Sequence, residues 1–342
     1  HELMTSADQV FIMGHANEDF DALGSGIGVA KMALALHKTC YIVNSGQGSS
    51  LKKLEAVSQG HSDPYMSLIV DEEEALERIT PGSILVLVDH HRPMLTAAPK
   101  VLQAIRKRII IDHHRRAEDA IRDAMLQYME PSTSSASEMV TEILQYFESK
   151  MPFTEVEATA LYAGIVVDTK NFAVQTGERT FEAAAFLRRN GADPRMVFQL
   201  FKDDENTVRT RARIITEMQQ PLPGLAVSIH KCSAQDKDVP VIVAQAADEL
   251  LTMDDIHTSV VLSENENGVS ISARSDGNIN AQVMMEELGG GGHQTVAGAQ
   301  VKGVTAEQLM PRVLALYQEQ NQELKESESD ESDSIAGYQE AR

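Results

Sequence analysis

Residues 10–21 read Val-Phe-Ile-Met-Gly-His-Ala-Asn-Glu-Asp-Phe-Asp, an apolar run that stops at Gly14-His15 and leads into a group of carboxylates. Apolar residues then recur at helical spacing over Ala22–His37. A short apolar run followed by such a helix is typical of a parallel sheet. Further runs lie at Thr39–Asn44, Ser67–Asp71, Ser83–Asp89 and Arg108–Asp112. We therefore predict an α/β fold that begins with a parallel, doubly wound sheet.

Length and composition restrict the class of protein. A chain of 342 residues suggests two domains. The formal net charge of −21 opposes binding of long nucleic acids through their phosphates. Every apolar run is shorter than the roughly 18 residues of a membrane span. Only Cys40 and Cys232 are present, which indicates a reducing compartment and excludes a cysteine-based metal site.

Breaks in the pattern predict the domain organisation. The sequence Gln219–Gly224 interrupts a charged helical stretch, and Asn267-Gly268 predicts a β-hairpin beyond it. We expect a linker or added sequence at 1–9, a catalytic domain at 10–218, a linker at 219–224, a smaller α/β domain at 225–322 and a disordered acidic tail at 323–342.

Polar side chains gather where the predicted strands end. Gly14-His15, Asp89-His90 and Asp112-His113 each follow an apolar run, and ligands of parallel sheets bind beyond the carboxyl ends of the strands. Two carboxylates about 4 Å apart repel by roughly 4 kcal/mol at an effective dielectric constant near 20, so converging acids need a cation. The alternative is a solvated acidic loop in which Asp21 caps the next helix, with the histidines as caps or core hydrogen-bonders.

Histidine nitrogen and aspartate oxygen suit manganese or a similar octahedral ion better than structural zinc. Two ions about 3.5–4 Å apart can activate a bridging water for in-line displacement at phosphorus, which indicates phosphoester hydrolysis. Asp168, at the end of another apolar segment, adds a further carboxylate.

The second domain offers a possible anion site. Successive glycines at Gly289–Gly292 let backbone N–H groups approach a phosphate, and Arg274 can contact phosphate or stack on a base. A plain flexible loop and an exposed arginine at a strand end are the alternatives.

As an ordered set, the motifs from Val10 to Gly303 resemble the DHH phosphoesterase family with its DHH-associated C-terminal domain, and within it the catalytic module of the GdpP-type cyclic-di-AMP phosphodiesterases. The motifs are Gly14-His15…Asp19-Phe-Asp21…Gly24-Ser25, Val88-Asp89-x-His91-Arg92-Pro93, Asp112-His113-His114-Arg115, Asp168-Thr169-Lys170-x-Phe172, Gln175-Thr176-Gly177-x-Arg179-Thr180-Phe181 and Gly289 to His293. His90 departs from the small residue, such as Thr, that this branch often has there.

The resemblance implies two manganese ions and a set of site residues. His15, Asp19 and Asp89 would hold one ion, and Asp21, Asp89, His113 and Asp168 the other, so that Asp89 bridges. Asp112 would orient its neighbours, and catalytic His114 would contact the substrate phosphate or the nucleophilic water. The predicted substrate-binding residues, across an interdomain cleft, are Arg274, Ser275, Gly290, Gly291, Gly292 and His293.

The expected function is hydrolysis of cyclic di-AMP to linear 5′-pApA in second-messenger signalling. The alternatives are a phosphodiesterase for pApA or short oligonucleotides, a RecJ-like exonuclease and a noncatalytic nucleotide sensor. By analogy we expect a homodimer and a cytoplasmic module that is tethered to the membrane through segments outside this chain.

Overall fold

The computed structural model describes residues 1–58, 65–147, 151–233 and 239–322, so the predicted acidic tail at 323–342 lies outside the described residues. The chain forms two compact units, His1–Lys202 and Asp203–Arg342. This division precedes the expected linker at 219–224, because α10 (Glu205–Thr216) packs against α11 (Val239–Leu250) of the second unit. Part of that expected linker is instead a strand, β7 (Gln219–Leu222).

The first unit contains the predicted parallel sheet. Its strands are β1 (Gln9–Met13), β2 (Thr39–Val43), β3 (Ile69–Val70), β4 (Ile84–Val88), β5 (Arg108–Asp112) and β6 (Leu126–Met129). They are all parallel, in the order β3-β2-β1-β4-β5-β6. The order reverses between β1 and β4, which is the switch point where doubly wound folds bind ligands.

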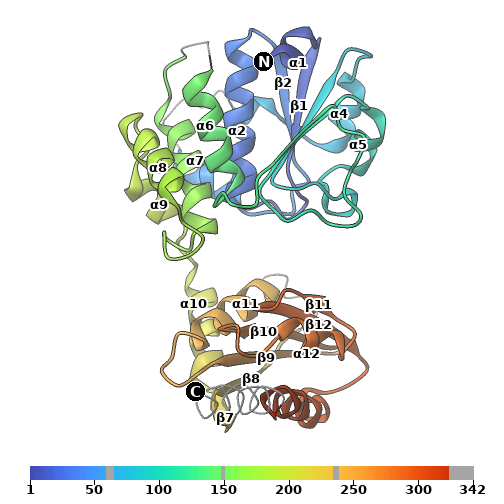
Figure 1. Ribbon diagram of the computed structural model, residues 1–342, viewed down its shortest axis with the longest axis vertical. Coiled ribbons are helices and arrows are strands. Elements are labelled where there is room, and N and C mark those ends of the chain that lie inside the picture. The colour runs from blue at the N-terminus through green and yellow to red at the C-terminus, as the bar shows by residue number, and fades with distance from the viewer. Residues whose placement is uncertain (59–64, 148–150, 234–238, 323–342) are drawn as a thin grey trace, which may run out of the picture. The chain divides into compact units, whose positions relative to one another are not determined.

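Helices cover both faces of this sheet (Figure 1). The helices α2 (Phe20–Ala35), α6 (Ala136–Tyr146) and α7 (Glu155–Asp168) lie on one face, and α4 (Glu72–Arg78) and α5 (Pro99–Ala104) lie on the other. Alternate residues of one strand enter different cores: Ile12 packs with the first set and Phe11 with the second. Burial on both faces explains the continuous apolar runs of the sequence.

The remaining elements complete the first unit. They are α1 (Glu2–Ser6), α3 (Ser50–Val57), α8 (Glu178–Arg189), α9 (Pro194–Leu200) and 3-10 turns at Met66–Leu68 and Pro93–Leu95. Met4 of α1 is buried in the main core, and Gln9 opens β1. Residues 1–9 therefore contribute to the fold, whereas the sequence suggested a linker or added sequence.

A glycine allows close contact between helices beside the carboxyl ends of the strands. A Cβ atom at Gly164 of α7 would collide with Ser137 Oγ of α6 and lie 2.9 Å from Asp21 Oδ1 of α2. We expect Gly164→Ala to lower the free energy of unfolding by about 1–3 kcal/mol, because the side chains of Ser137 and Asp21 that the new methyl group would meet are fully buried. Urea denaturation followed by circular dichroism measures this loss.

Gly26→Ala is the matched control for Gly164→Ala. Gly26 is also buried within a helix, but a Cβ there would meet only Ile12 Cγ2, at an ordinary 3.7 Å. Alanine is favoured over glycine inside helices by about 1 kcal/mol, so this variant should be as stable as the parent or more so. Equal stability of the two variants would contradict the close-packing explanation.

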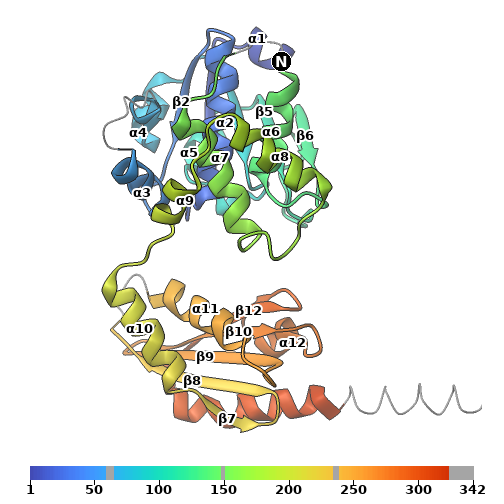
Figure 2. The same ribbon diagram turned by 90° about the vertical axis from the view of Figure 1, so that its left-hand side faces the viewer.

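The second unit contains a mixed sheet in the order β11-β12-β10-β9-β8-β7. Besides β7, its strands are β8 (Leu225–Lys231), β9 (Thr258–Asn265), β10 (Gly268–Ser275), β11 (Gly291–Gly292) and β12 (Val296–Lys302). The predicted hairpin is confirmed, since β9 and β10 pair antiparallel across the turn between Asn265 and Gly268. α10 and α11 pack on one face, while α12 (Ala281–Glu286) and helical residues 306–322 pack on the other (Figure 2).

Among the described residues, no helix combines the length and the apolar character needed to cross a lipid bilayer.

Candidate metal centre

The carboxyl ends of the central strands bring the predicted ligands together. His15 follows β1, Asp89 follows β4, and His113 follows β5. Because β1, β4 and β5 are neighbours in the sheet, these side chains meet at one edge. Asp168 is the last residue of α7. Asp19 is the N-cap of α2, where its Oδ1 accepts hydrogen bonds from two backbone N–H groups, so the capping role considered for Asp21 belongs to Asp19.

Three groups of potential ligands found among the described residues contain Asp89. One combines it with His113 and His114, and the other two hold the predicted metal ligands. In the first of these two, His15 Nε2 lies 3.3 Å from Asp89 Oδ2 and 3.7 Å from Asp19 Oδ1. In the second, which also contains Asp21, His113 Nε2 lies 3.1 Å from Asp168 Oδ2 and 3.4 Å from Asp89 Oδ1. Within each group, one ligand atom per residue lies within 4.8 Å of the others. The structure therefore brings together all six residues that the sequence singled out.

The residues fit a pair of divalent cations. Their donors are carboxylate oxygens, which suit manganese, together with imidazole nitrogens, which are ligands of transition metals rather than of magnesium. Asp89 Oδ1 and His113 Nε2 are buried and have no hydrogen-bond partner of normal geometry. Buried polar atoms are almost always satisfied, so these two atoms indicate a missing partner between them. A cation held by these residues would satisfy both atoms.

The carboxylate of Asp21 is held by the start of α6. Its Oδ2 accepts a hydrogen bond of 2.7 Å from the backbone N–H of Ala136, and Oδ1 accepts one of 2.8 Å from that of Ser137. Asp21 is completely buried. Both contacts fix the orientation of the carboxylate before any ligand binds. This support could not be predicted from the sequence, because it joins residues more than a hundred positions apart through backbone groups.

Asp89 has an unusual backbone conformation. Its φ of +60° lies in the left-handed region, which few residues other than glycine occupy. The backbone N–H of Asp89 donates to the carbonyl of Ile111, 3.0 Å away, which ties the turn after β4 to β5. Strained backbone of this kind is concentrated at functional sites. The carboxylate of Asp89 lies between the two groups, with Oδ2 near His15 Nε2 and Oδ1 near His113 Nε2.

Burial and neighbouring charges shift the pKa values of the centre. Burial opposes protonation of His15 and His113, but interactions with the surrounding carboxylates raise their pKa values to about 10 and about 11. Burial raises the pKa of Asp168 to about 6, and burial with the charges of Asp89 and Asp168 raises the pKa of Asp21 well above its usual value. The centre thus has an excess of negative charge, which divalent cations would relieve.

Comparison with family models identifies the two units. The model described as the DHH family, N-terminal domain, matches residues 9–165, and the model of the DHHA1 domain matches residues 225–323. The chain belongs to the DHH family. The DHH match includes every predicted metal ligand except Asp168, which lies three residues beyond it, and the DHHA1 match includes the mixed sheet except β7.

Several curated relatives match nearly the whole chain, among them two GdpP proteins. The cyclic-di-AMP phosphodiesterase GdpP of Bacillus subtilis is 39% identical over 315 residues, which cover 91% of this chain and 48% of the relative. GdpP of Geobacillus thermodenitrificans is 41% identical over 322 residues, which cover 92% and 48%. The chain spans about half the length of these relatives.

One solved structure shows the same fold. The crystal structure of an exopolyphosphatase-related protein from Bacteroides fragilis has a TM-score of 0.78 and 18% identity. The match covers 95% of this chain and 96% of that one. It supports the α/β architecture of the chain.

The motif Asp112-His113-His114 that is typical of the DHH domain contains a fixed hydrogen-bond network. Asp112 accepts a short hydrogen bond from His91 Nδ1 and one of 2.8 Å from His114 Nδ1. His91 Nε2 accepts from the backbone N–H of Ala117 at 2.9 Å, so both nitrogens of His91 are engaged. With Nδ1 bound to Asp112, His114 has Nε2 available, and its side chain is 56% exposed. This arrangement suits a group that exchanges a proton with substrate.

His90 is buried next to Asp89 in the sequence. Its Nδ1 donates to the backbone carbonyl of Val88 at 3.1 Å, and its Nε2 has no hydrogen-bond partner among the described residues. Burial lowers its pKa, which favours the neutral ring. His90 belongs to none of the potential ligand groups found among the described residues.

In the DHHA1 domain, Arg274 and Ser275 already have partners. The guanidinium of Arg274 is buried, and its Nε donates to Asp248 Oδ1 at 3.0 Å. Ser275 Oγ accepts from the backbone N–H of Gly277 at 3.0 Å. The side chains of Arg274 and Ser275, which were expected to face substrate, thus also form hydrogen bonds within their own domain.

The glycine run of the DHHA1 domain packs against β12. A Cβ atom at Gly290 would collide with the backbone of Gly298, and one at Gly292 with that of Ala297. Gly291 and Gly292 form the short strand β11, and His293 is exposed. Close strand packing therefore accounts for Gly290 and Gly292 without a ligand.

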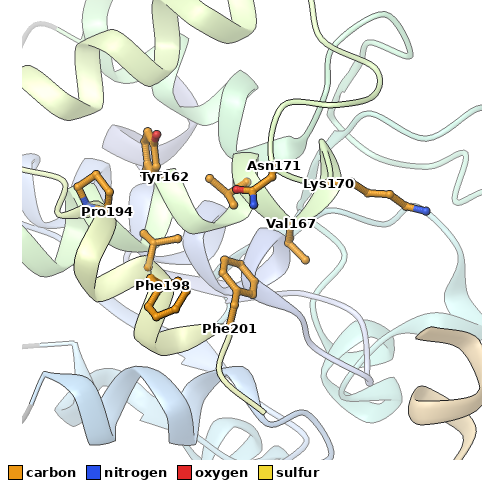
Figure 3. A pocket seen from close by; sticks show the side chains of 9 residues that line it. Tyr162, Val167, Lys170, Asn171, Pro194, Phe198 and Phe201 are labelled. Atoms are coloured by element: carbon orange, nitrogen blue, oxygen red, sulfur yellow. The ribbon is translucent and has the colours of Figure 1, made fainter. Parts of the chain in front are cut away.

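A hollow of about 450 Å³ lies between α7 and α9 of the DHH domain (Figure 3). Its lining is mostly apolar, including Phe198 and Phe201, while the side chain of Lys170 extends away from the others. None of the predicted metal or catalytic residues lines it. The hollow is therefore separate from the candidate metal centre.

Proposed function

We propose that the chain is a manganese-dependent phosphodiesterase that hydrolyses cyclic di-AMP to 5′-pApA. The observation that carries this proposal is the pair of ligand groups sharing Asp89 at the switch point of the DHH domain. The names of the two GdpP relatives support cyclic di-AMP as the substrate. The net charge of −21 also favours a small substrate over a nucleic-acid polymer.

The site residues would have two kinds of role, which are to hold the ions and to orient the group that exchanges a proton. His15, Asp19 and Asp89 would hold one ion, and Asp21, Asp89, His113 and Asp168 would hold the other. When bound, the ions would supply Lewis acidity, which can lower the pKa of water and neutralise charge on the phosphoryl group. Asp112 orients His114 through Nδ1, which directs Nε2 outward.

Hydrolysis to 5′-pApA breaks a bond between phosphorus and a 3′ oxygen. The water oxygen forms the new bond to phosphorus, the 5′-phosphate stays on the product, and the departing 3′ oxygen requires a proton. His114 Nε2 would contact the phosphate or the attacking water, and from there it can exchange a proton. Arg274, Ser275, Gly290, Gly291, Gly292 and His293 of the DHHA1 domain would bind the nucleotide.

Product analysis tests this function. The chain is incubated with cyclic di-AMP and manganese, and the products are separated by chromatography beside 5′-pApA and AMP standards. We expect 5′-pApA to accumulate, and chelation with EDTA to stop the reaction. Intact substrate with manganese-loaded protein would contradict the proposal. Faster cleavage of pApA or short oligonucleotides than of cyclic di-AMP would favour the oligonucleotide phosphodiesterase instead.

Two further implications of the family resemblance stay predictions. One is a homodimer, which size-exclusion chromatography with light scattering measures directly. The other is a membrane tether in segments outside this chain.

A further inference from the structure

We propose that Glu18 is a positioning residue for the first ligand group. It joins the ligand loop, residues 14–19, to the glycine loop, residues 44–50, which follows β2. Through this link it holds His15 and Asp19 in place for their cation. This inference rests on the proposed two-ion centre and assigns a role to a residue outside both potential ligand groups.

The side chain of Glu18 makes the central link between the loops. It is 9% exposed, and its Oε2 accepts a hydrogen bond of 2.6 Å from Asn44 Nδ2. The other end of the Asn44 amide is also engaged, since its Oδ1 accepts from the backbone N–H of Gly46 at 2.6 Å. Glu18 and Asn44 thus form a chain of contacts from the ligand loop into the glycine loop.

Backbone contacts reinforce this link on both sides of Glu18. Ser45 Oγ donates to the carbonyl of Ala16 at 2.6 Å, and Ser50 Oγ donates to the carbonyl of Glu18 at 3.2 Å. A Cβ atom at Gly48 would collide with that same carbonyl of Glu18. The two loops therefore pack too closely for one to move without the other.

The first ligand group depends on this packing more than the second does. Its loop ligands, His15 and Asp19, lie on either side of Glu18. The opposite edge of the loop has a backbone hydrogen bond of 2.7 Å from Ala16 to Leu95. Amides of α2 also hold Asp19, so the dependence on the Glu18 link is greatest for His15. In the second group, α6 fixes Asp21 through two amides, and Asp168 is part of α7. Loss of the Glu18 link should therefore affect one ion site selectively.

Manganese titration by isothermal calorimetry on the full chain tests the role of Glu18. Groups that orient metal ligands typically contribute about 10–100-fold to metal affinity. We expect Glu18→Ala to weaken one of two manganese sites at least about tenfold and to leave the other unchanged. Glu18→Gln, which keeps an oxygen for Asn44 Nδ2, should restore affinity to near the parent value.

Asn44→Ala adds a double-mutant cycle. It should weaken the same site as Glu18→Ala, and the double variant should be no worse than either single one, because both remove one shared link. If Glu18→Ala fails to fold, Ser45→Ala replaces it in the test. This variant removes only the hydrogen bond to the carbonyl of Ala16, and it should weaken manganese binding at the same site to a smaller extent. Asp71→Ala is the control: it removes the N-cap of α4, which is a stability loss away from the centre.

The outcomes separate this inference from the proposed function. A lower melting temperature of Glu18→Ala with two unchanged manganese sites would show a merely structural role and overturn the inference. Equal weakening of both sites, or additive effects of Glu18 and Asn44, would also overturn it. A parent chain that binds no manganese would instead overturn the proposed function itself.

Discussion

Asp89→Asn should eliminate turnover while leaving the fold intact. One potential ligand group contains His15 and the other contains Asp168, and Asp89 is the residue that these two groups share. Its replacement therefore removes a charged ligand from each proposed ion. Substitution of residues that only support metal ligands costs about 10–100-fold, and we expect the loss at Asp89 to exceed that range. Asparagine has the same shape as aspartate and accepts the φ of +60° found here.

The measurement is the rate of cyclic di-AMP hydrolysis at saturating manganese, with circular dichroism to verify the fold. Asp71→Asn is a matched control, because Asp71 caps α4 away from the centre and asparagine caps helices equally well. The control should retain full activity. Activity of Asp89→Asn within a factor of ten of the parent would rule out a bridging role for Asp89.

His114→Asn should lower kcat by about 10²–10⁴-fold, the usual contribution of a general acid or base. The asparagine amide can still donate to Asp112 from nearly the position of His114 Nδ1, so the network around Asp112 is preserved. What the variant loses is Nε2, the ring nitrogen not held by Asp112. Manganese binding should stay unchanged, which calorimetry measures alongside the rate.

His37→Asn is the control for this change. His37 lies at the end of α2 with a φ of +56°, which asparagine tolerates, and it is not part of any potential ligand group among the described residues. Loss of a manganese ion from His114→Asn would contradict the proposed role. It would make His114 a ligand, as its closeness to Asp89 and His113 permits.

The fold could be predicted where local pattern and burial agree. The runs that became β1, β4 and β5 are buried throughout and apolar except at their ends, because both faces of a parallel sheet are covered by helices. At the sheet edge the signal weakens: the predicted strand at Ser67–Asp71 is only Ile69–Val70, and β6 has no fully buried residue. The boundary between the units also escaped prediction, since it depends on the packing of α10 against α11 rather than on a local break.

For the site, the sequence was informative about which residues meet and less so about what holds them. Strand ends in a parallel sheet converge, and therefore His15, Asp89 and His113 could be placed at one edge. The support of Asp21 by the start of α6 and the contact of Glu18 with Asn44 are long-range and involve residue types with many other roles. The glycine run is a conspicuous sequence motif, but the motif does not indicate its own cause. Close packing against β12 explains Gly290 as well as phosphate binding does.

Anomalous diffraction at the manganese absorption edge, from crystals of this chain grown with manganese, tests the two-ion centre most directly. We expect two peaks on either side of Asp89. One should be coordinated by His15 and Asp19, and the other by Asp21, His113 and Asp168, with Asp89 contacting both. A single peak, no peak, or two peaks with Asp89 turned away from either one would contradict the centre proposed here.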